Sequence, residues 1–419
     1  KEEMSLNRKS PKVDPRIHLG IDNCFAIKRW TTPMAWGKAI KDMGLQYVEA
    51  VPDLECEPLL TPTDYRKDWV EEVKRMQEEL GIRVVMFYSN DSTYDSIGFS
   101  HPDRRIRDHF VEKWFGNFIE MAAALSADIG YYVQATPENM LYSRKDRKLA
   151  KEYAFECMVR VNRMAKSAGI QHVALEQMYT PHQPPFTIAG MRKLIRDVSK
   201  ESGMPFYLTE DVGHHCPFYM RPTEEQLRKA HARYRKDRYV EIWLGSREAY
   251  DLFAGAASEE KLSRDVLEAM AEDFEKNADL FATRDDTDCY AWLRALGAWS
   301  PVIHMQQTDG SHSSHEPFLP ENNADGIVHP TEILKALWAC YAQEAPEGMP
   351  AQCEDIYLIQ ELYLSTKDIG YQGLYKLAAS TDYLREFIPA DGMRLSELLE
   401  LNGIKAGGLT DERLQGAGN

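Results

Sequence analysis

Five side chains that can bind a metal ion or carry a proton lie at or near the ends of short apolar runs. They are Glu176, Asp211, His214, His304 and Glu361. An apolar run that ends in acidic or imidazole side chains is typical of a buried strand that leads into a loop. We therefore expect these side chains to lie where four successive strands end.

Four of them, Glu176, Asp211, His304 and Glu361, would supply three carboxylates and one imidazole. Such an oxygen-rich set suits Mn²⁺, Mg²⁺ or Co²⁺ better than a thiolate zinc site does. Taken singly, an acid at a strand end is commonly a helix cap, and a strand histidine is commonly a core residue. Buried acids on consecutive strands would repel one another unless a cation lay between them. The joint pattern therefore predicts one divalent-cation site.

Alternating strand and helix patterns supply the frame that must position this site. We predict strands over residues 17–27, 45–51, 82–88, 129–134, 170–175, 206–209, 301–305 and 356–359. We predict intervening helices over residues 33–43, 64–80, 104–125, 147–167, 188–200, 331–343 and 371–387. Eight such units predict an α/β fold, the (β/α)8 TIM barrel, in which the C-terminal strand ends converge on one site. An open doubly wound sheet is the alternative, but no GxGxxG or GxxxxGK[ST] motif opens any unit.

The remaining segments define the expected domain organisation. Residues 1–16 form an N-terminal arm, residues 17–392 the barrel, and residues 393–419 a C-terminal extension. Between the sixth and seventh strands, residues 220–298 are too many for one crossover helix and predict several helices, at least one of them amphipathic. This helical insertion would serve as a lid, as an oligomer contact, or only as an enlarged outer layer.

Bulk composition excludes several function classes. The net charge of −16 disfavours a nucleic-acid or anionic-membrane surface, and no apolar run is long enough to span a membrane. We expect a cytoplasmic protein with a small-molecule partner. The seven cysteines include no CxxC pair, so we predict neither a disulfide scaffold nor a cysteine zinc site. Cys216 is the cysteine nearest the proposed metal ligands.

The sequence resembles the xylose isomerase-like TIM-barrel superfamily of sugar and sugar-phosphate isomerases and epimerases. The resemblance rests on Glu176, on Asp211 and His214 in a D-x-x-H motif, and on His304 and Glu361. In the ketose 3-epimerase branch the matching Glu, Asp, His and Glu bind the metal, and the two glutamates also move the proton. The resemblance therefore implies that Glu176 and Glu361 are the acid/base pair and that His214 contacts the substrate. It also implies a homo-oligomer.

The implied reaction is proton transfer through a metal-bound enediolate. Removing a proton next to a ketone needs a base near the carbon and a cation near the oxygen that gains charge. Two carboxylates facing each other would allow 3-epimerisation, and one base shuttling between adjacent carbons would allow aldose–ketose isomerisation. A lyase of the same superfamily, resembling inosose dehydratase or a decarboxylase, is the alternative enzyme. A catalytically inactive sugar-binding barrel is the alternative outside enzymes.

Two positions depart from the free-ketose epimerases. An arginine expected six residues after His304 is Gly310, and a glutamate expected six residues after Glu176 is His182. The substrate pocket should therefore differ from theirs. The string from Gln306 to residue 318 resembles instead the erythrulose-phosphate isomerase/epimerase branch.

Further polar residues follow the strands and are candidates for binding substrate. The predicted substrate contacts are His214, Gln306, His182, His312, His315 and Lys28. The serines and histidines of residues 311–315 would hold a phosphate or sugar hydroxyls, or would form only a solvated loop. Weaker candidates are Arg29, Trp30, Glu49, Asp53, Tyr88, Asn90 and Asp91. Strand alternation predicts that Glu210 and His215 point away from the site.

Overall fold

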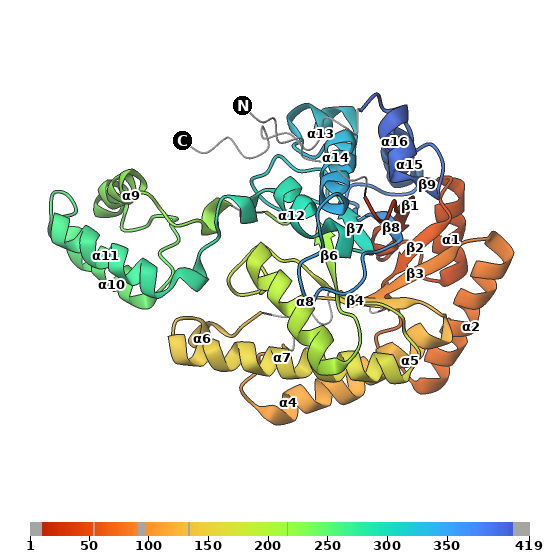
Figure 1. The fold of residues 1–419 in the computed structure, drawn as a ribbon, viewed down its shortest axis with the longest axis horizontal. Coiled ribbons are helices and arrows are strands. Elements are labelled where there is room, and N and C mark those ends of the chain that lie inside the picture. The colour runs from red at the N-terminus through yellow and green to blue at the C-terminus, as the bar shows by residue number, and fades with distance from the viewer. Residues whose placement is uncertain (1–10, 53–54, 91–97, 133–134, 216, 405–419) are drawn as a thin grey trace, which may run out of the picture.

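Eight parallel strands close into a barrel in the computed structural model, which describes residues 11–404 except 53–54, 91–97, 133–134 and 216 (Figure 1). Each strand pairs with the next along the chain, and β1 pairs with both β2 and β8, which closes the ring. The strands are β1 (Arg16–Asp22), β2 (Tyr47–Ala50), β3 (Arg83–Tyr88), β4 (Asp128–Tyr131), β5 (Val173–Glu176), β6 (Tyr207–Asp211), β7 (Val302–Met305) and β8 (Asp355–Gln360). The predicted (β/α)8 barrel is confirmed.

The strands of the candidate site are buried on both faces. Every residue of β5, β6 and β7 is buried, as expected for parallel strands covered by helices. Their register sets Glu176 beside Thr209 and Asp211 beside His304. Ligand candidates on neighbouring strands therefore reach the same level of the barrel.

Helices surround this barrel. They are α1 (Pro33–Asp42), α2 (Thr63–Leu80), α4 (Arg104–His109), α5 (Gly116–Ala124), α6 (Glu138–Leu141), α7 (Arg144–Ser167), α8 (Ile188–Ser202), α12 (Cys289–Leu296), α13 (Pro320–Asp325), α14 (Pro330–Tyr341) and α15 (Tyr371–Arg385). The helix predicted over 104–125 is divided by a π-helical turn, η3 (Phe110–Phe115). The first strand ends at Asp22, five residues earlier than predicted, because a 3-10 turn over Cys24–Ala26 follows it.

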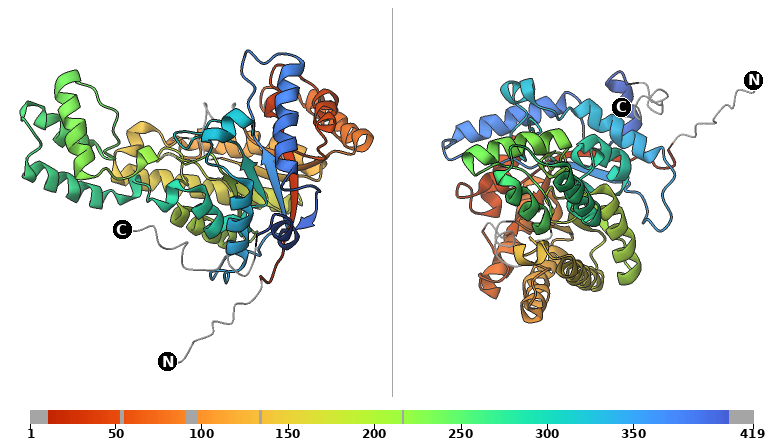
Figure 2. Two further views of the ribbon diagram at one scale, coloured as in Figure 1. Left: turned by 90° about the horizontal axis from the view of Figure 1, so that it is seen from above. Right: turned by 90° about the vertical axis from the view of Figure 1, so that its left-hand side faces the viewer.

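Residues 220–282 form an insertion subdomain with its own hydrophobic core. It contains α9 (Glu224–Asp237), α10 (Arg247–Gly255) and α11 (Arg264–Lys276), which project from one side of the barrel (Figures 1 and 2). Met220 and Ala282 pair at its base. The predicted insertion ran to residue 298, but α12 packs in the main barrel core instead. This last helix is the ordinary crossover between β6 and β7.

The insertion subdomain is fixed to α6 and α7 through a buried arginine. Arg147 donates 2.8 Å to the Asn277 side chain and 2.9 Å to the Leu141 carbonyl, and it pairs with Asp279 at 3.2 Å. Leu141 also belongs to the subdomain's hydrophobic core. These contacts indicate that the insertion subdomain packs against α6 and α7 and is not joined to the barrel by its connecting segments alone.

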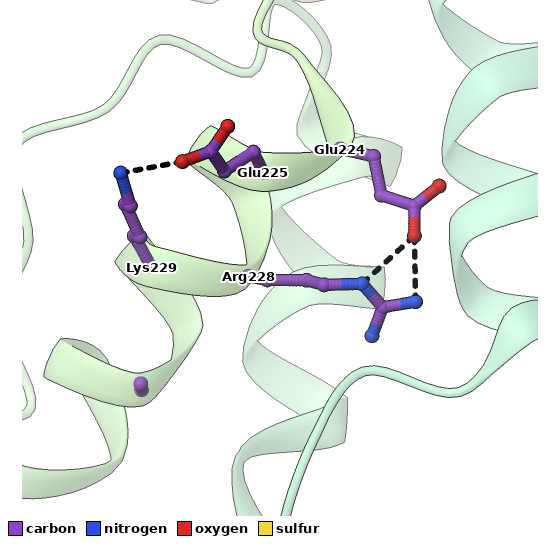
Figure 3. A pocket seen from close by; sticks show the side chains of 5 residues that line it. Glu224, Glu225, Arg228 and Lys229 are labelled. Carbon is purple, nitrogen blue, oxygen red and sulfur yellow. Dashed lines mark hydrogen bonds and ion pairs between the residues drawn. The ribbon is translucent and has the colours of Figure 1, made fainter.

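The outward face of α9 carries charges that neutralise one another. Glu224 accepts from Arg228, and Glu225 pairs with Lys229, each four residues along the helix (Figure 3). Exposed pairs of this kind contribute only about 0.3–0.5 kcal/mol each. We interpret this face as a solvated surface.

The chain ends against the first strand. A two-residue strand, β9 (Met393–Arg394), pairs antiparallel with β1 and is followed by α16 (Leu395–Leu401). The predicted C-terminal helix is thus preceded by a strand that covers the start of β1. Among the described helices, none has the length and apolar character needed to cross a membrane.

Candidate metal and proton-transfer site

Glu176, Asp211, His304 and Glu361 come together at the C-terminal ends of β5 to β8. One ligand atom from each lies within 4.8 Å of the others. The Nδ1 atom of His304 is 3.1 Å from Glu176 Oε1 and 3.2 Å from Glu361 Oε2. One ring nitrogen and two carboxylates thus point to a common centre. The structure brings together the four residues that the sequence nominated as metal ligands.

The charge balance around this centre fits a cation. Asp22 and Glu49 add two further carboxylates, and each is only 1% exposed. Burial raises the pKa of Asp22 well above its usual value, with nearby Glu361 adding to the shift. Burial likewise raises the pKa of Asp211 to about 6, although His214 opposes the shift. Acids that hold protons in such a cluster would release them to solvent when a divalent cation binds.

Glu361 differs from the other acids of the cluster. Burial acts to raise its pKa, but the imidazoles of His315 and His304 outweigh burial and hold the pKa below its usual range. Its Oε2 atom lies 3.2 Å from His304 Nδ1 and 3.6 Å from His315 Nδ1. An ionised carboxylate at the centre of such a cluster is suited to bind a cation and to accept a proton.

Glu49 holds the far side of the His304 ring. Its Oε1 and Oε2 atoms lie 3.0 and 3.2 Å from His304 Nε2. Burial raises the pKa of Glu49 to about 7 although His304 opposes the shift. A carboxylate at the second ring nitrogen fixes which nitrogen faces a metal. The sequence suggested a substrate contact for Glu49, whereas the structure places it behind His304.

His214 lies beside the cluster as the D-x-x-H motif suggested. Its Nδ1 atom is 2.8 Å from the Gln177 carbonyl, and its Nε2 atom is 3.1 Å from Asp211 Oδ2. The ring also packs against Tyr179, with centroids 4.7 Å apart. The carbonyl takes the Nδ1 proton, so Nε2 is the nitrogen directed to the site.

Gln306 joins Asp211 to the following loop. Its Nε2 donates to the two Asp211 oxygens at 3.0 and 2.9 Å, and its Oε1 accepts from the His315 backbone at 2.6 Å. A Cβ atom on Gly213 would lie 2.2 Å from the Gln306 side chain. Gly213, in the D-x-x-H motif, therefore leaves room for the Gln306 side chain. Gln306 was predicted to contact substrate. In the structure its side-chain amide hydrogen-bonds instead to Asp211 and to the His315 backbone.

Residues 311–315 satisfy most of their polar groups among themselves. Ser311 contacts both Asp309 and His312, and Ser313 contacts Gln306. His312 is exposed. His315 turns inward, 3.6 Å from Glu361 Oε2 and edge-on to Tyr363 at 4.8 Å. Of the two predicted loop histidines, the structure brings only His315 to the cluster.

Lys28 and His182 lie at the rim. His182 Nδ1 is 3.2 Å from the Thr136 carbonyl, and no described residue of the four-ligand cluster contacts it. Lys28 is exposed on the turn after β1. Its neighbour Arg29 donates to three carbonyls of residues 364–368 and is therefore structural.

The structure also adds residues that the sequence did not nominate. Asp22 was hidden because the first strand was predicted to run past it, so it did not stand at a strand end. Tyr363 lies two residues beyond Glu361, and its hydroxyl donates to Asn90 Oδ1 at 3.4 Å. Alternation along the chain after β8 could have suggested it. Tyr88 packs edge-on to His304, with ring centroids 5.1 Å apart.

Glu210 and His215 point away from the cluster, as the alternation predicted. Both are buried, and neither side chain has a hydrogen-bond partner among the described residues. Burial raises the pKa of Glu210 well above its usual value and lowers that of His215. The candidates Asp53, Asp91 and Cys216 lie outside the described residues. The six described cysteines are buried and unpaired.

Comparison with known proteins confirms the resemblance. Residues 38–242 match the family described as xylose isomerase-like TIM barrel. Over 245 residues the chain is 24% identical to the D-erythrulose 1-phosphate 3-epimerase of Brucella abortus (strain 2308). That match spans 57% of this chain and 57% of the relative's length.

Solved structures share the fold at low sequence identity. A candidate xylose isomerase from Rhodospirillum rubrum ATCC 11170 has a TM-score of 0.63 at 18% identity, covering 88% of this chain and 99% of its own. D-Psicose 3-epimerase from Clostridium cellulolyticum H10, solved with D-tagatose, has a TM-score of 0.51 at 13% identity, covering 88% and 98%. These neighbours establish the barrel, and the homologues as a group are sugar isomerases and epimerases.

Proposed function

We propose that this chain, which carries a xylose isomerase-like TIM barrel, is a sugar epimerase or isomerase that uses one divalent cation. Its substrate would be a small ketose or ketose phosphate, and its reaction a proton transfer at the carbon next to the carbonyl. The observation that carries the proposal is the placement of His304 Nδ1 between Glu176 and Glu361, at 3.1 and 3.2 Å.

The cation would be held by Glu176, Asp211, His304 and Glu361. The donor set fits Mn²⁺, Mg²⁺ or Co²⁺, because three carboxylates and one imidazole are hard or borderline ligands. When bound, such an ion would lower the pKa of the carbon acid by withdrawing charge from the adjacent oxygen. All other steps fall to the side chains.

Glu361 and Glu176 would move the proton. Glu361 is ionised at rest, because the imidazoles of His315 and His304 hold its pKa below the usual range, and it is therefore available to accept a proton. Glu176 comes from β5 and Glu361 from the end of β8, so they reach the centre from different sides of the ring. If they face opposite sides of a planar enediol, removal by one and return by the other inverts the carbon.

Surrounding residues would position these groups. Glu49 orients His304, and Gln306 orients Asp211, each through the hydrogen bonds described above. His214 Nε2 and the His315 ring lie at the edge of the cluster and would donate to substrate oxygens. Tyr179 and Tyr363 supply apolar ring surface that limits the access of water.

Solvent exchange tests the proposal directly. Tetrulose and pentulose ketoses, free and phosphorylated, are incubated in D₂O with the enzyme and Mn²⁺, and ¹H NMR follows the protons beside the carbonyl. We expect deuterium to enter at that carbon together with a C3 epimer or an aldose. Exchange accompanied by loss of water or CO₂ would assign a lyase instead. Absence of exchange with every ketose would refute proton transfer as the reaction.

A further inference from the structure

A pocket opens beside the metal-ligand cluster, between the turn after β1 and the segment after β8. Its volume is about 340 Å³. Two of its lining residues, Lys28 and Thr366, present polar groups at its edge. The full lining is Cys24, Ile27, Lys28, Arg29, Tyr363, Leu364, Thr366 and Ile369.

Lys28 is displayed without a partner at this pocket. Its backbone is left-handed, with φ +58°, a conformation that costs a non-glycine residue about 1 kcal/mol or more. No described residue forms an ion pair with its ammonium group. Arg29, the other cation of the pocket, is fixed by backbone carbonyls and leaves Lys28 as the charge available to a ligand.

Some exposed cations of this chain differ from Lys28 because they are already paired. On α9, Arg228 and Lys229 are each paired with a glutamate one turn earlier (Figure 3). At the other rim of the site, the hydroxyls of the serines in residues 311–315 donate hydrogen bonds to groups of the same loop and to Gln306. The Lys28 pocket therefore has the stronger geometric case for holding an anion.

The pocket shares its wall with the cluster. Tyr363 lines the pocket, and its ring packs edge-on to His315, which lies 3.6 Å from Glu361. Cys24 also lines the pocket, and its backbone N–H donates 3.2 Å to Asp22. A group bonded one or two atoms from a reacting carbon at the cluster would extend past these side chains toward Lys28.

An anionic substrate would need a positive side chain near the pocket, because the neighbouring cluster is rich in carboxylates. The cluster contains the buried carboxylates of Asp22, Glu49, Glu176 and Asp211 and the partly buried carboxylate of Glu361. A phosphate, which carries about −1.5 to −2 charges at pH 7, would be repelled by those acids beyond what one divalent ion neutralises. A positive side chain at the far end of the substrate offsets this repulsion.

We propose that the pocket lined by Lys28, Thr366 and Tyr363 binds the phosphate group of a phosphorylated ketose. The ammonium of Lys28 pairs with the phosphate, the Thr366 hydroxyl donates to it, and the Tyr363 ring separates it from the acids. The inference rests on the proposed function and adds to it a substrate class and a position. The pocket would bind the phosphate end of the substrate, and proton transfer would take place at the metal-ligand cluster.

Lys28→Met tests the assignment, because it removes the charge and keeps the aliphatic stem. Lys38→Met, on the exposed face of α1, is the matched control. We expect Lys28→Met to lower kcat/KM for a ketose phosphate about 10- to 100-fold, the range for loss of one charge-assisted hydrogen bond. The value for the same ketose without phosphate should change less than about twofold. Inorganic phosphate should inhibit the wild type competitively and the variant more weakly by a similar factor.

The possible failures are separable. An equal loss for phosphorylated and free ketose, or no loss for either, would overturn the phosphate assignment while leaving the proton-transfer proposal intact. If no ketose is turned over, ³¹P NMR line broadening of inorganic phosphate still decides the pocket. Broadening that persists in Lys28→Met would then overturn the assignment, and broadening lost in that variant alone would support it.

Discussion

The acidic residues at the two ends of strands β1 and β8 differ in whether an arginine pairs with them. At the N-terminal end, Arg16 Nε donates 2.7 Å to Asp355 Oδ1, and His18 Nε2 lies 2.8 Å from the same oxygen. At the C-terminal end, Asp22 and Glu361 follow the same two strands, and no described lysine or arginine forms an ion pair with either of them. One end is neutralised within the protein, and the other is not.

The pKa shifts follow this difference. The hydrogen bond from Arg16 lowers the pKa of Asp355 to about 2, and His18 adds to the effect. Burial raises the pKa of Asp22 well above its usual value, and Glu361 adds to that shift. Barrel enzymes place chemistry at the C-terminal strand ends and stability at the N-terminal ends. In this chain the contrast rests on Asp22 and Asp355, because His315 and His304 hold the pKa of Glu361 below its usual range as well.

Glu361→Gln should have the largest effect on activity. The amide keeps the side chain's shape but can neither accept a proton nor contribute a negative ligand. We expect turnover of ketose to fall at least about 10³-fold, within the range for general-base removal, with unchanged circular dichroism. Because the imidazoles of His315 and His304 stabilise the ionised carboxylate, its loss should lower the thermal midpoint at pH 7 rather than raise it. Retained turnover would remove Glu361 from the acid/base pair.

Addition of a divalent cation should stabilise the protein through the ligands at the C-terminal ends of the strands and independently of the residues at their N-terminal ends. Binding to the folded state alone contributes about 2.7 kcal/mol at a concentration 100 times Kd. We therefore expect Mn²⁺ to raise Tm after chelator treatment, as measured by differential scanning calorimetry. In Asp211→Asn the rise should shrink strongly, and in Asp355→Asn it should persist. An equal rise in both variants would place the ion elsewhere.

Glu49→Gln should act on affinity for the metal more than on chemistry. The variant weakens the carboxylate that orients His304, and such second-layer changes cost about 10- to 100-fold in affinity. Isothermal titration with Mn²⁺ measures this without any substrate. Glu354→Gln, on the exposed residue before β8, is the control and should bind Mn²⁺ as the wild type does. If saturating Mn²⁺ does not restore most of the turnover of Glu49→Gln, Glu49 has a role beyond positioning.

Much of the fold followed from local sequence signals. Periodic apolar runs gave the eight strands, and glycines marked helix ends, as at Gly81 and Gly203, which adopt φ +70° and +69°. The boundary of the insertion did not follow, because α12 is an amphipathic helix like those before it. Only its packing against α14 and the barrel core separates it from the insertion subdomain.

The candidate site was predictable where it depended on strand ends and not where it depended on contacts across the barrel. Glu176, Asp211, His304 and Glu361 lie on four consecutive strands, so chain order places them together. Glu49 lies on β2, and only closure of the ring brings it to His304. Side chains that fill a closed barrel from non-adjacent strands leave no spacing signal in the sequence.

Asp355→Asn should have the smallest effect, confined to stability and to pH above about 4. The folded pKa of about 2 lies below the ordinary aspartate value, so the native state favours the ionised form. The resulting stabilisation is present above about pH 4 and is lost as pH falls through the folded pKa. Because Arg16 is partly exposed, we expect Tm at pH 7 to drop by only about 1–2 °C.

Comparison across pH completes the test of the two barrel ends. The Tm difference between wild type and Asp355→Asn should close on going from pH 6 to pH 2, because the wild-type carboxylate becomes protonated. Turnover at pH 7 should stay within about twofold of wild type, since Asp355 is at the end of the strands remote from the cluster. A large loss of turnover would mean that the Arg16–Asp355 pair at the N-terminal strand ends also affects the cluster at the C-terminal ends. The two ends would then not have separate roles in stability and catalysis. A pH-independent Tm difference would instead show that the Arg16–Asp355 pair contributes packing and not charge.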